Sequence, residues 1–316
     1  MVSYKKKIAL IFGISGQDGI YLSKLLIDKN YTVIGTSRVK RNNISNFKKV
    51  GITKAIKIYK INPQNENEVK KIIKLTHCNE IYYFSGISSV SYSFKHPEET
   101  LIANTKGIIN ILESCRLINK KIKIYNAATG ECFGSSKKSI DENSPFLPNS
   151  PYALSKTVNS HIVKNYRDNL GMWVINGFSF NHDSPLRPKN YILKKISDYV
   201  KRRPNKKLEV GNINISRDWS WAPEHVNFIY KIMQLNKPED FIIGTGHSEK
   251  LKNLINHFFI LFNIKKNNIK INKKFIRKDD IKFSCSNPKK LKKKFNAIPV
   301  INVKTIINNM ISDKFF

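Results

Sequence analysis

A threonine and a glutamate that could take part in proton transfer stand two positions apart in the sequence, at Thr129 and Glu131. The preceding residues 123–128 have the β-branched and aromatic content of a strand that runs into small residues. If the extended geometry persists to the end of that strand, alternation places the hydroxyl and the carboxylate on one face. The pair therefore predicts a site that handles protons.

A tyrosine and a lysine follow at Tyr152 and Lys156, within residues 150–169, which we expect to be helical. Ser150 is a suitable N-cap, and Gly171 follows the expected end of the helix. Residues four apart share a helical face, so the phenol and the ammonium are neighbours there. An ammonium makes a nearby phenol acidic enough for proton transfer near neutral pH. With the threonine and the glutamate, this gives two independent proton-transfer groups, more than a simple alcohol dehydrogenase requires.

A glycine-rich turn near the start of the chain predicts a dinucleotide-binding site. The apolar run 8–12 has the pattern of a buried strand, Gly13, Gly16 and Gly19 follow it, and residues 21–29 have a helical pattern. Glycines in such a turn permit a tight bend and close approach of the backbone, while the helix N-terminus faces a pyrophosphate. The glycine spacing is GxxGxxG rather than GxGxxG. The prediction therefore rests on the order of strand, glycine turn and helix.

Arg38 indicates which dinucleotide is bound. The next strand, expected over 31–36, ends without the acidic residue that would accept hydrogen bonds from the ribose of NAD. Arg38 stands there instead, with Lys40 and Arg41 close behind, and a cation suits the 2′-phosphate of NADP. The alternative is that Arg38 is a surface charge without this role.

The remaining chain alternates between strand and helix patterns. Further strands are expected over residues 55–61, 80–84, 122–127, 173–178 and 241–243. Helices are expected over residues 66–75, 97–118, 150–169 and 224–235. This order predicts an α/β fold with a Rossmann-like, doubly wound parallel sheet.

After about residue 180 this rhythm loosens, which predicts a smaller, discontinuous C-terminal lobe that binds the substrate. We expect residues 1–180 to form an NADP-binding domain, to which residues 218–245 return. Residues 181–217 and 246–316 should form the substrate-binding lobe.

The amino-acid composition limits the cellular locations and the kinds of site that we expect. The sequence contains no run of roughly eighteen or more apolar residues, so we expect no membrane-spanning helix. The N-terminal apolar run is too short for a signal-peptide core, which predicts a cytoplasmic protein. The four cysteines form no CxxC pair and the seven histidines show no HxxH-type spacing, so neither a disulfide framework nor a metal site is expected.

The formal net charge of +33 raises the question of nucleic-acid binding. The lysines are, however, spread over every segment, and no run interleaves aromatic residues with arginine as base stacking would require. Nucleic acid is therefore not expected as the main partner. A positive field also favours an anionic substrate.

Longer motifs identify the group that the sequence resembles. They are GISGQDGIYL (13–22), ATGECFG (128–134), PFLPNSPYALSK (145–156), FNHDSPLRP (180–188), GNINISRDWSWAPE (211–224) and PEDFIIGTG (238–246). From residue 8 to about residue 299 the chain resembles the extended short-chain dehydrogenase/reductase superfamily and, within it, the GDP-mannose 4,6-dehydratase family. YxxxK and GxxGxxG belong to the whole superfamily, whereas the NHDSP and RDW segments are narrower.

The resemblance implies a redox-neutral conversion of GDP-mannose to GDP-4-keto-6-deoxymannose, with NADP as cofactor, by a homo-oligomeric enzyme. Tyr152, positioned by Lys156, would take the proton of the sugar 4-hydroxyl, and Thr129 would hydrogen-bond that hydroxyl. Glu131 would remove the C5 proton and return it to the departing water.

The resemblance also implies binding residues. Cofactor contacts would be Gly13, Gly16, Gln17, Asp18, Gly19, Arg38, Asn62, Ser85, Tyr152 and Lys156. Substrate contacts would be Ser88, Asn181, Arg187, Lys195, Arg217, Arg277 and Asp280. Arginine suits the phosphates because its guanidinium pairs with their oxygens bidentately.

Three alternatives stay open. A GDP-heptose or a related sugar could replace GDP-mannose after small changes in the pocket. The same fold could serve an NADPH-consuming reductase or epimerase that acts on a GDP-keto-sugar. A different class is a basic NADP- or RNA-binding protein whose catalysis has decayed.

Overall fold

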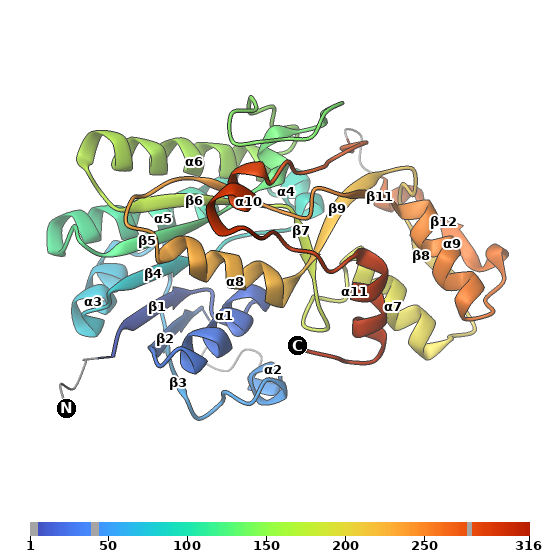
Figure 1. Ribbon diagram of the computed structural model, residues 1–316, viewed down its shortest axis with the longest axis horizontal. Helices are drawn as coiled ribbons and strands as arrows, with labels where there is room; N and C mark the ends of the chain where they lie inside the picture. The colour runs from blue at the N-terminus through green and yellow to red at the C-terminus, as the bar shows by residue number, and fades with distance from the viewer. Residues whose placement is uncertain (1–5, 39–43, 277–279) are drawn as a thin grey trace. The chain divides into compact units, whose positions relative to one another are not determined.

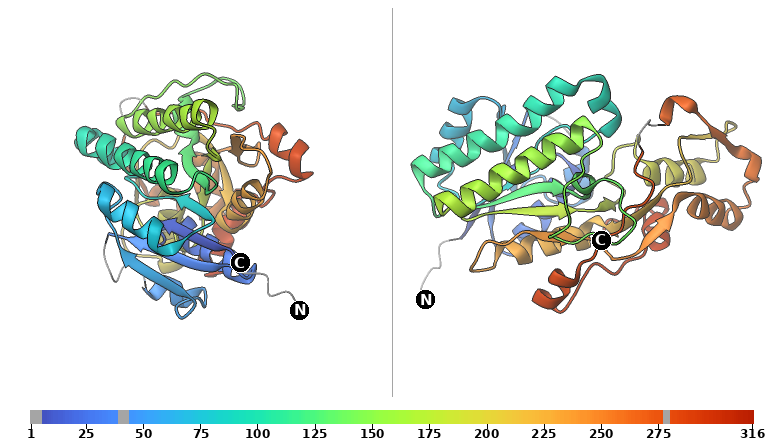
Figure 2. Two further views of the ribbon diagram at one scale, coloured as in Figure 1. Left: turned by 90° about the vertical axis from the view of Figure 1, so that its left-hand side faces the viewer. Right: turned by 90° about the horizontal axis from the view of Figure 1, so that it is seen from above.

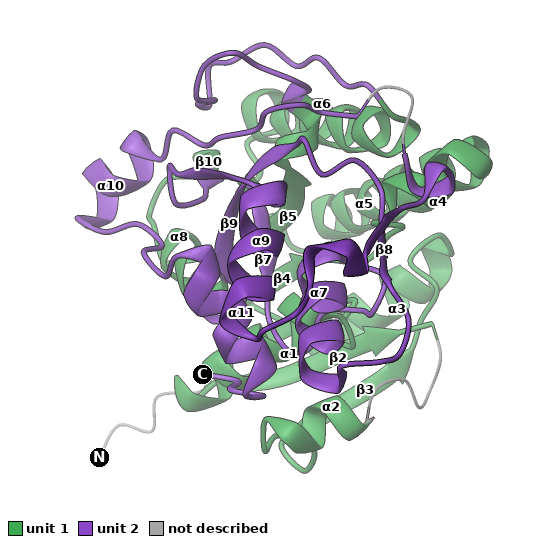
Figure 3. Ribbon diagram, turned by 90° about the vertical axis from the view of Figure 1, so that its right-hand side faces the viewer, with its two compact units in different colours: residues 1–132, 150–178, 226–241 green, residues 133–149, 179–225, 242–316 purple. Residues whose placement is uncertain are grey.

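The computed structural model describes residues 6–38, 44–276 and 280–316 (Figure 1, with further views in Figure 2). Its backbone divides into two compact units (Figure 3). Unit 1 comprises Met1–Cys132, Ser150–Phe178 and Val226–Phe241, and unit 2 comprises Phe133–Asn149, Ser179–His225 and Ile242–Phe316. Residues 133–149, 179–180, 218–225 and 242–245 group with unit 2, whereas the sequence placed them in the nucleotide-binding domain.

A seven-stranded sheet runs through unit 1 in the order β10-β6-β5-β4-β1-β2-β3. Its strands are β1 (Ile8–Phe12), β2 (Thr32–Ser37), β3 (Ile56–Lys60), β4 (Glu80–Tyr83), β5 (Lys123–Thr129), β6 (Val174–Ser179) and β10 (Phe241–Ile243). The pairs β1–β2, β2–β3, β1–β4 and β4–β5 are parallel. Because the strand order reverses between β1 and β4, the sheet is doubly wound, and the predicted Rossmann-like fold class is confirmed.

Helices cover both faces of this sheet. One face is covered by α3 (Glu66–Thr76), α5 (Pro97–Ile118) and α6 (Pro151–Leu170), and α5 and α6 lie side by side (Figure 2). The other face carries α1 (Gln17–Asp28) and α8 (Ala222–Met233) (Figure 1). Leu10 and Phe12 pack against the first group, while Ala9 and Ile11 point to the opposite face and are also fully buried. Two short helices, α2 (Ile44–Lys49) and α4 (Val90–Lys95), follow β2 and β4.

Unit 2 has its own core, built from short elements. One sheet has the order β11-β9-β7, and a second pairs β12 with β8. These strands are β7 (Asn181–Asp183), β8 (Leu208–Val210), β9 (Ser216–Trp221), β11 (Ser248–Lys250) and β12 (Ile269–Ile271). The helices are α7 (Ile192–Arg202), α9 (Leu251–Leu261), α10 (Lys289–Phe295) and α11 (Val303–Ile311). Trp219 and Trp221 of β9 share an apolar cluster with side chains of α7, α9 and α11.

Asp218, a buried carboxylate on β9, holds three segments of unit 2 together. Its Oδ1 accepts hydrogen bonds from the Thr245 N–H at 3.0 Å and the Thr245 hydroxyl at 2.6 Å. Its Oδ2 accepts from the Gly246 N–H at 3.0 Å and the Ser286 N–H at 3.1 Å, and the Ser286 hydroxyl donates to the same oxygen. These donors compensate a charge whose burial would otherwise be costly.

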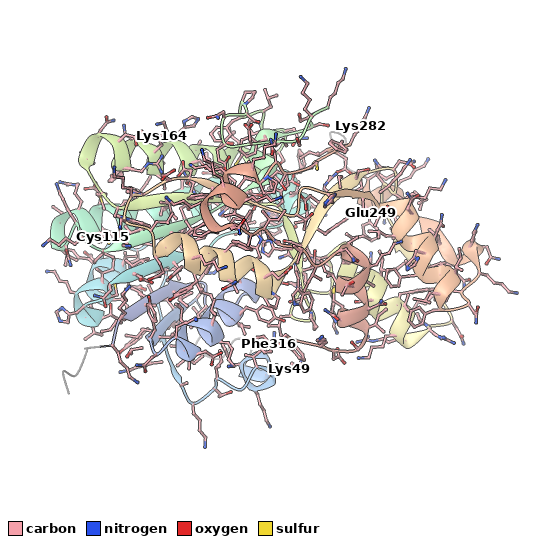
Figure 4. All side chains as sticks on the ribbon, viewed as in Figure 1. Lys49, Cys115, Lys164, Glu249, Lys282 and Phe316 are labelled. Carbon is pink, nitrogen blue, oxygen red and sulfur yellow. The ribbon has the colours of Figure 1, made fainter. Side chains whose placement is uncertain are left out.

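The basic side chains are distributed over both units. Lys49 on α2, Lys164 on α6 and Lys282 in unit 2 are all exposed and extend from the ribbon (Figure 4). No helix in the described part of the chain combines the length and the apolar composition needed to cross a membrane.

Replacing Asp218 with asparagine tests the role of its carboxylate. Asp218→Asn turns one acceptor oxygen into an NH2 group that faces N–H and O–H donors, so the free energy of unfolding should fall by about 3 kcal/mol. Chemical denaturation measures the change. Asp313→Asn is the matched control, because the Asp313 side chain is 53% exposed beside Lys201; it should cost less than about 0.5 kcal/mol. Equal losses in the two variants would contradict the role given to Asp218.

Candidate active site

A glycine turn connects β1 to α1. Gly13 has a φ of 84°, and a Cβ at this position would lie 2.9 Å from the backbone nitrogen of Ser85. A Cβ on Gly19 would lie 2.7 Å from the carbonyl oxygen of Gly13. Helix α1 begins at Gln17, directly after Gly16, which has no side chain to cap it. The N-terminus of α1 therefore follows a glycine turn, which is the arrangement that binds an anion such as a phosphate.

Arg38 and Asn62 lie just beyond the carboxyl ends of β2 and β3, neighbouring strands of the sheet. Both residues are exposed. The side-chain oxygen of Asn62 accepts from the Gln64 N–H at 3.2 Å. Open parallel sheets bind their ligands at the carboxyl ends of the strands, so both residues occupy the edge where a dinucleotide is expected.

Asn104 on α5 anchors the loop 84–89, which carries the two predicted serines. Its Oδ1 accepts from the Ile87 N–H at 2.7 Å, and its Nδ2 donates to the Ile87 carbonyl at 3.2 Å. The same Nδ2 donates to Ser155 Oγ on α6 at 2.8 Å. Gly86 has a φ of 143°, and a Cβ there would lie 2.4 Å from Asn104 Oδ1. Asn104 was not predicted from the sequence. The feature that could have identified it is a polar residue within an apolar helical pattern.

Thr129 is the last residue of β5, and Glu131 lies in the 3-10 turn η1 (Gly130–Phe133) that follows. The expectation that strand alternation aligns them is wrong, because the strand ends before Glu131. A hydrogen bond connects them instead, since the Glu131 N–H donates to Thr129 Oγ1 at 3.3 Å. With that oxygen already accepting, the Thr129 proton can be donated to a bound substrate.

Helix α6 begins and ends as its sequence predicts. Ser150 Oγ accepts from the Ala153 N–H at 3.1 Å, and Gly171 ends the helix with a φ of 65°. Tyr152 is 9% exposed and Lys156 is 6% exposed, so both side chains lie on the buried side of the helix.

Lys156 fixes α6 to β5. Its ammonium donates to the carbonyl oxygen of Ala127 at 2.8 Å, two residues before Thr129. Burial lowers the pKa of Lys156 to about 8, because the charged form loses hydration there. The hydrogen bond therefore ties the helix that carries Tyr152 to the strand that ends in Thr129.

Cys132 connects η1 to the start of α6, and sequence reasoning gave it no role. Its Sγ lies 3.9 Å from the carbonyl oxygen of Ala153, the residue after Tyr152. Burial raises the pKa of the Cys132 thiol to about 11. The charge of Lys156 acts to lower this pKa, and that of Glu131 acts to raise it. The turn with the glutamate and the start of the helix with the tyrosine are thus adjacent within unit 1.

Two of the residues predicted to bind substrate pair with each other in unit 2. The Arg217 Nη2 lies 3.3 Å from Asp280 Oδ1, and its Nη1 donates to the carbonyls of Ile281 at 2.6 Å and Ser216 at 3.0 Å. Only 4% of Arg217 is exposed, so these contacts fix its guanidinium. Arg277 lies outside the described residues.

The other predicted substrate residues lie on β7 and beside α7. Asn181 begins β7 and pairs with Trp219 of β9. The Arg187 Nε lies 3.2 Å from Asp183 Oδ1. Lys195 is half-buried in the first turns of α7, and burial lowers the pKa of its ammonium. Unit 2 thus carries cationic groups on separate short segments.

Within the described residues, no three His, Cys, Asp or Glu side chains are grouped to hold a metal ion. The four cysteines are free thiols, and all are buried.

The sequence matches a known protein family. The model of the family described as GDP-mannose 4,6 dehydratase matches residues 10–310. GDP-mannose 4,6 dehydratase 1 of Arabidopsis thaliana is 30% identical over 323 residues, covering 98% of this chain and 90% of that protein. A GDP-mannose 4,6-dehydratase of Vibrio cholerae is 34% identical over 264 residues, covering 79% and 70% of the two chains.

Solved structures share the fold. The dTDP-glucose 4,6-dehydratase of Bacillus anthracis in complex with NAD has a TM-score of 0.85 at 20% identity, over 97% of this chain and 96% of that one. RMD from Pseudomonas aeruginosa complexed with NADPH has a TM-score of 0.81 at 17% identity, over 98% of each chain. Both structures contain a nicotinamide dinucleotide.

The depressed pKa of Lys156 predicts a pH dependence of stability. In the folded protein Lys156 loses its proton near pH 8, whereas an unfolded lysine keeps its proton up to about pH 10.4. Between these values the unfolded state binds more protons, so the free energy of unfolding gains up to about 1.4 kcal/mol per pH unit from this group.

Lys156→Met removes that titration. Urea denaturation of the ligand-free proteins at several pH values should therefore show that any stability advantage of the variant shrinks as the pH rises from 8 to 10. Identical pH slopes in the two proteins would contradict the depressed pKa.

Proposed function

The chain belongs to the GDP-mannose 4,6-dehydratase family of hydro-lyases, and we propose that it converts GDP-mannose to GDP-4-keto-6-deoxymannose on one bound sugar. One observation supports the proposed chemistry most directly. The hydrogen bond from Lys156 Nζ to the Ala127 carbonyl fixes α6, the helix that carries Tyr152, against the strand that ends in Thr129, and Glu131 lies in the turn that follows.

The proposed reaction begins at the sugar 4-hydroxyl. Tyr152 removes the hydroxyl proton, and the ammonium of Lys156 stabilises the phenolate that accepts it. Thr129, whose oxygen already accepts from the Glu131 N–H, donates its own proton to the same substrate oxygen. A bound nicotinamide dinucleotide supplies the hydride acceptor for this oxidation and the donor for the final reduction.

Loss of water follows from the ketone formed at C4. The ketone makes the C5 proton acidic, and Glu131 removes it as a general base. The same carboxyl group then gives its proton to the leaving 6-hydroxyl, so that one water departs and Glu131 returns to its starting state. The final reduction would take up one proton at C5, which balances the proton that Tyr152 took from the 4-hydroxyl and returns Tyr152 to its starting state. Glu131 is half-buried, which leaves its side chain accessible for both transfers.

We propose NADP as the dinucleotide and the glycine turn as its pyrophosphate site. Gln17 and Asp18 open α1 behind Gly16, and Ser85 lies against Gly13. Arg38, exposed beyond β2, would pair with the 2′-phosphate through charge-assisted hydrogen bonds. Asn62, beyond β3, would contact the adenosine.

The nucleotide sugar would contact the predicted residues of unit 2, and Ser88 stays a predicted substrate contact of unit 1. The buried guanidinium of Arg217, oriented by Asp280, would bind the diphosphate, and Arg187 and Lys195 would add positive charge. Asn181 would contact the sugar, and Asp280 with Arg277 would contact the nucleoside.

We further propose that the enzyme works in the cytoplasm as a homo-oligomer. The four buried thiols form no disulfide, as in a reducing compartment. Leu101 and Ile102 on α5 and Leu154 on α6 are large apolar side chains that stay exposed, which supports association of these helices with a second copy.

The role of Glu131 is tested with GDP-mannose and NADP+. Glu131→Gln keeps the shape of the side chain but removes its basicity, so formation of the 4-keto-6-deoxy product should fall by about 10²–10⁴. Reduced-nicotinamide absorbance should then accumulate, because oxidation at C4 does not need Glu131. Tyr152→Phe is the matched control and should give neither the product nor the absorbance. Mass spectrometry measures how much of the 4-keto-6-deoxy product forms. Undiminished dehydration by Glu131→Gln would overturn the role proposed for Glu131.

The choice of cofactor is tested separately. Arg38→Ala removes the proposed partner of the 2′-phosphate, so the affinity for NADP+ should fall about tenfold to a hundredfold, while the affinity for NAD+ stays the same. Calorimetric titration measures both. Lys164→Ala removes an exposed cation on α6 and should change neither the affinity for NADP+ nor the affinity for NAD+. Equal affinity of the Arg38 variant and the native protein for NADP+ would rule out this selectivity.

A further inference from the structure

Cationic groups and aromatic rings alternate in a row on the surface of unit 2. The Arg187 guanidinium carbon lies 3.8 Å from the centre of the Tyr191 ring. The Lys195 Nζ lies 4.2 Å from the centre of the Phe275 ring. Tyr191 and Lys195 are one helical turn apart, and the Lys195 N–H donates to the Tyr191 carbonyl at 2.9 Å. Tyr191 and Lys195, one from each cation–ring pair, therefore lie one turn apart at the start of α7.

The turn that carries Phe275 is held by Asn272. Asn272 Oδ1 accepts from the Lys274 N–H at 3.0 Å, and Asn272 Nδ2 donates to Glu209 Oε2 at 2.9 Å. The Asn272 N–H donates to the Val210 carbonyl at 2.8 Å. Two of these contacts fix the turn to β8, and the contact with Lys274 lies within the turn itself.

Gly211 lets the Phe275 backbone come close. A Cβ on Gly211 would lie 2.4 Å from the Phe275 carbonyl oxygen, so a larger residue would push the turn away. The Phe275 side chain nevertheless remains 47% exposed, although the Lys195 ammonium lies over its ring. The fixed turn thereby presents a large aromatic ring that has a cation near it and nearly half of the residue's surface open to solvent.

We propose that Phe275 is the platform on which the base of the nucleotide sugar stacks, with Lys195 behind the ring. This proposal rests on the proposed function, because it requires a nucleotide substrate. Bases stack well on aromatic side chains, and a cation behind the ring withdraws electron density from it, which favours an electron-rich purine on the open face. The two cations of the row also suit the diphosphate that is attached to the nucleoside.

The experiment compares GDP with inorganic pyrophosphate as ligands for the full-length protein. Phe275→Leu keeps an apolar side chain but removes the ring, so GDP should bind about tenfold more weakly while pyrophosphate binds as before. The KM for GDP-mannose should rise by a similar factor at unchanged kcat. Phe275→Trp should retain the affinity for GDP, and its added fluorescence should be quenched by GDP but not by pyrophosphate. Ile276→Ala, at an exposed apolar neighbour, is the control and should change neither affinity.

Each outcome decides a different point. If Phe275→Leu binds GDP as tightly as the native protein, the platform is absent and the proposed function is unaffected. If it loses GDP and pyrophosphate equally, Phe275 supports the fold of the site rather than the base, and the proposal is overturned. If the native protein does not bind GDP at all, the proposed function fails and the platform fails with it.

Discussion

The burial of one ammonium group is the constraint on which the candidate active site depends. Holding the Lys156 charge away from water costs about 3 kcal/mol at neutral pH, judging from its pKa of about 8. Its hydrogen bond to the Ala127 carbonyl compensates part of that cost. This hydrogen bond can form only when α6 lies directly against β5. The packing that buries the lysine therefore also fixes where the phenol and the strand end stand. A lysine whose pKa lies near the working pH is in turn suited to adjust the pKa of a neighbouring phenol.

The two units reach rigidity by different means. Unit 1 carries the proposed catalytic groups on a long helix and at the end of a strand of a parallel sheet, where the apolar packing of α3, α5 and α6 supplies stability. Unit 2 has strands of only three to six residues and relies on polar contacts between distant segments, above all those of Asp218 and Asn272. Glycine at 211 and 246 accommodates close backbone approaches or a positive φ in these segments. Residues that recognise a ligand can then sit on short segments without losing their positions.

Local signals in the sequence were sufficient for much of the fold. The capping serine and the terminal glycine place α6 within one residue of its expected range, and the helix expected over 97–118 coincides with α5. Contacts between distant segments were not accessible in this way. Glu131 was expected on a strand that ends two residues earlier, and the roles of Asn104 and Cys132 depend on partners in α6. The three-residue strands of unit 2 are too short to show alternation, so that lobe was predicted only as a loosening of the pattern.

The central claim is that oxidation, loss of water and reduction take place on a single sugar without release of an intermediate. The most direct test is mass spectrometry of the product formed from GDP-mannose that carries deuterium at C4, with unlabelled NADP+ present. We expect the deuterium to reappear at C6 of the same sugar, in every turnover and without net reduction of NADP+. Loss of the label to the free cofactor pool, or a product that retains it at C4, would contradict this account.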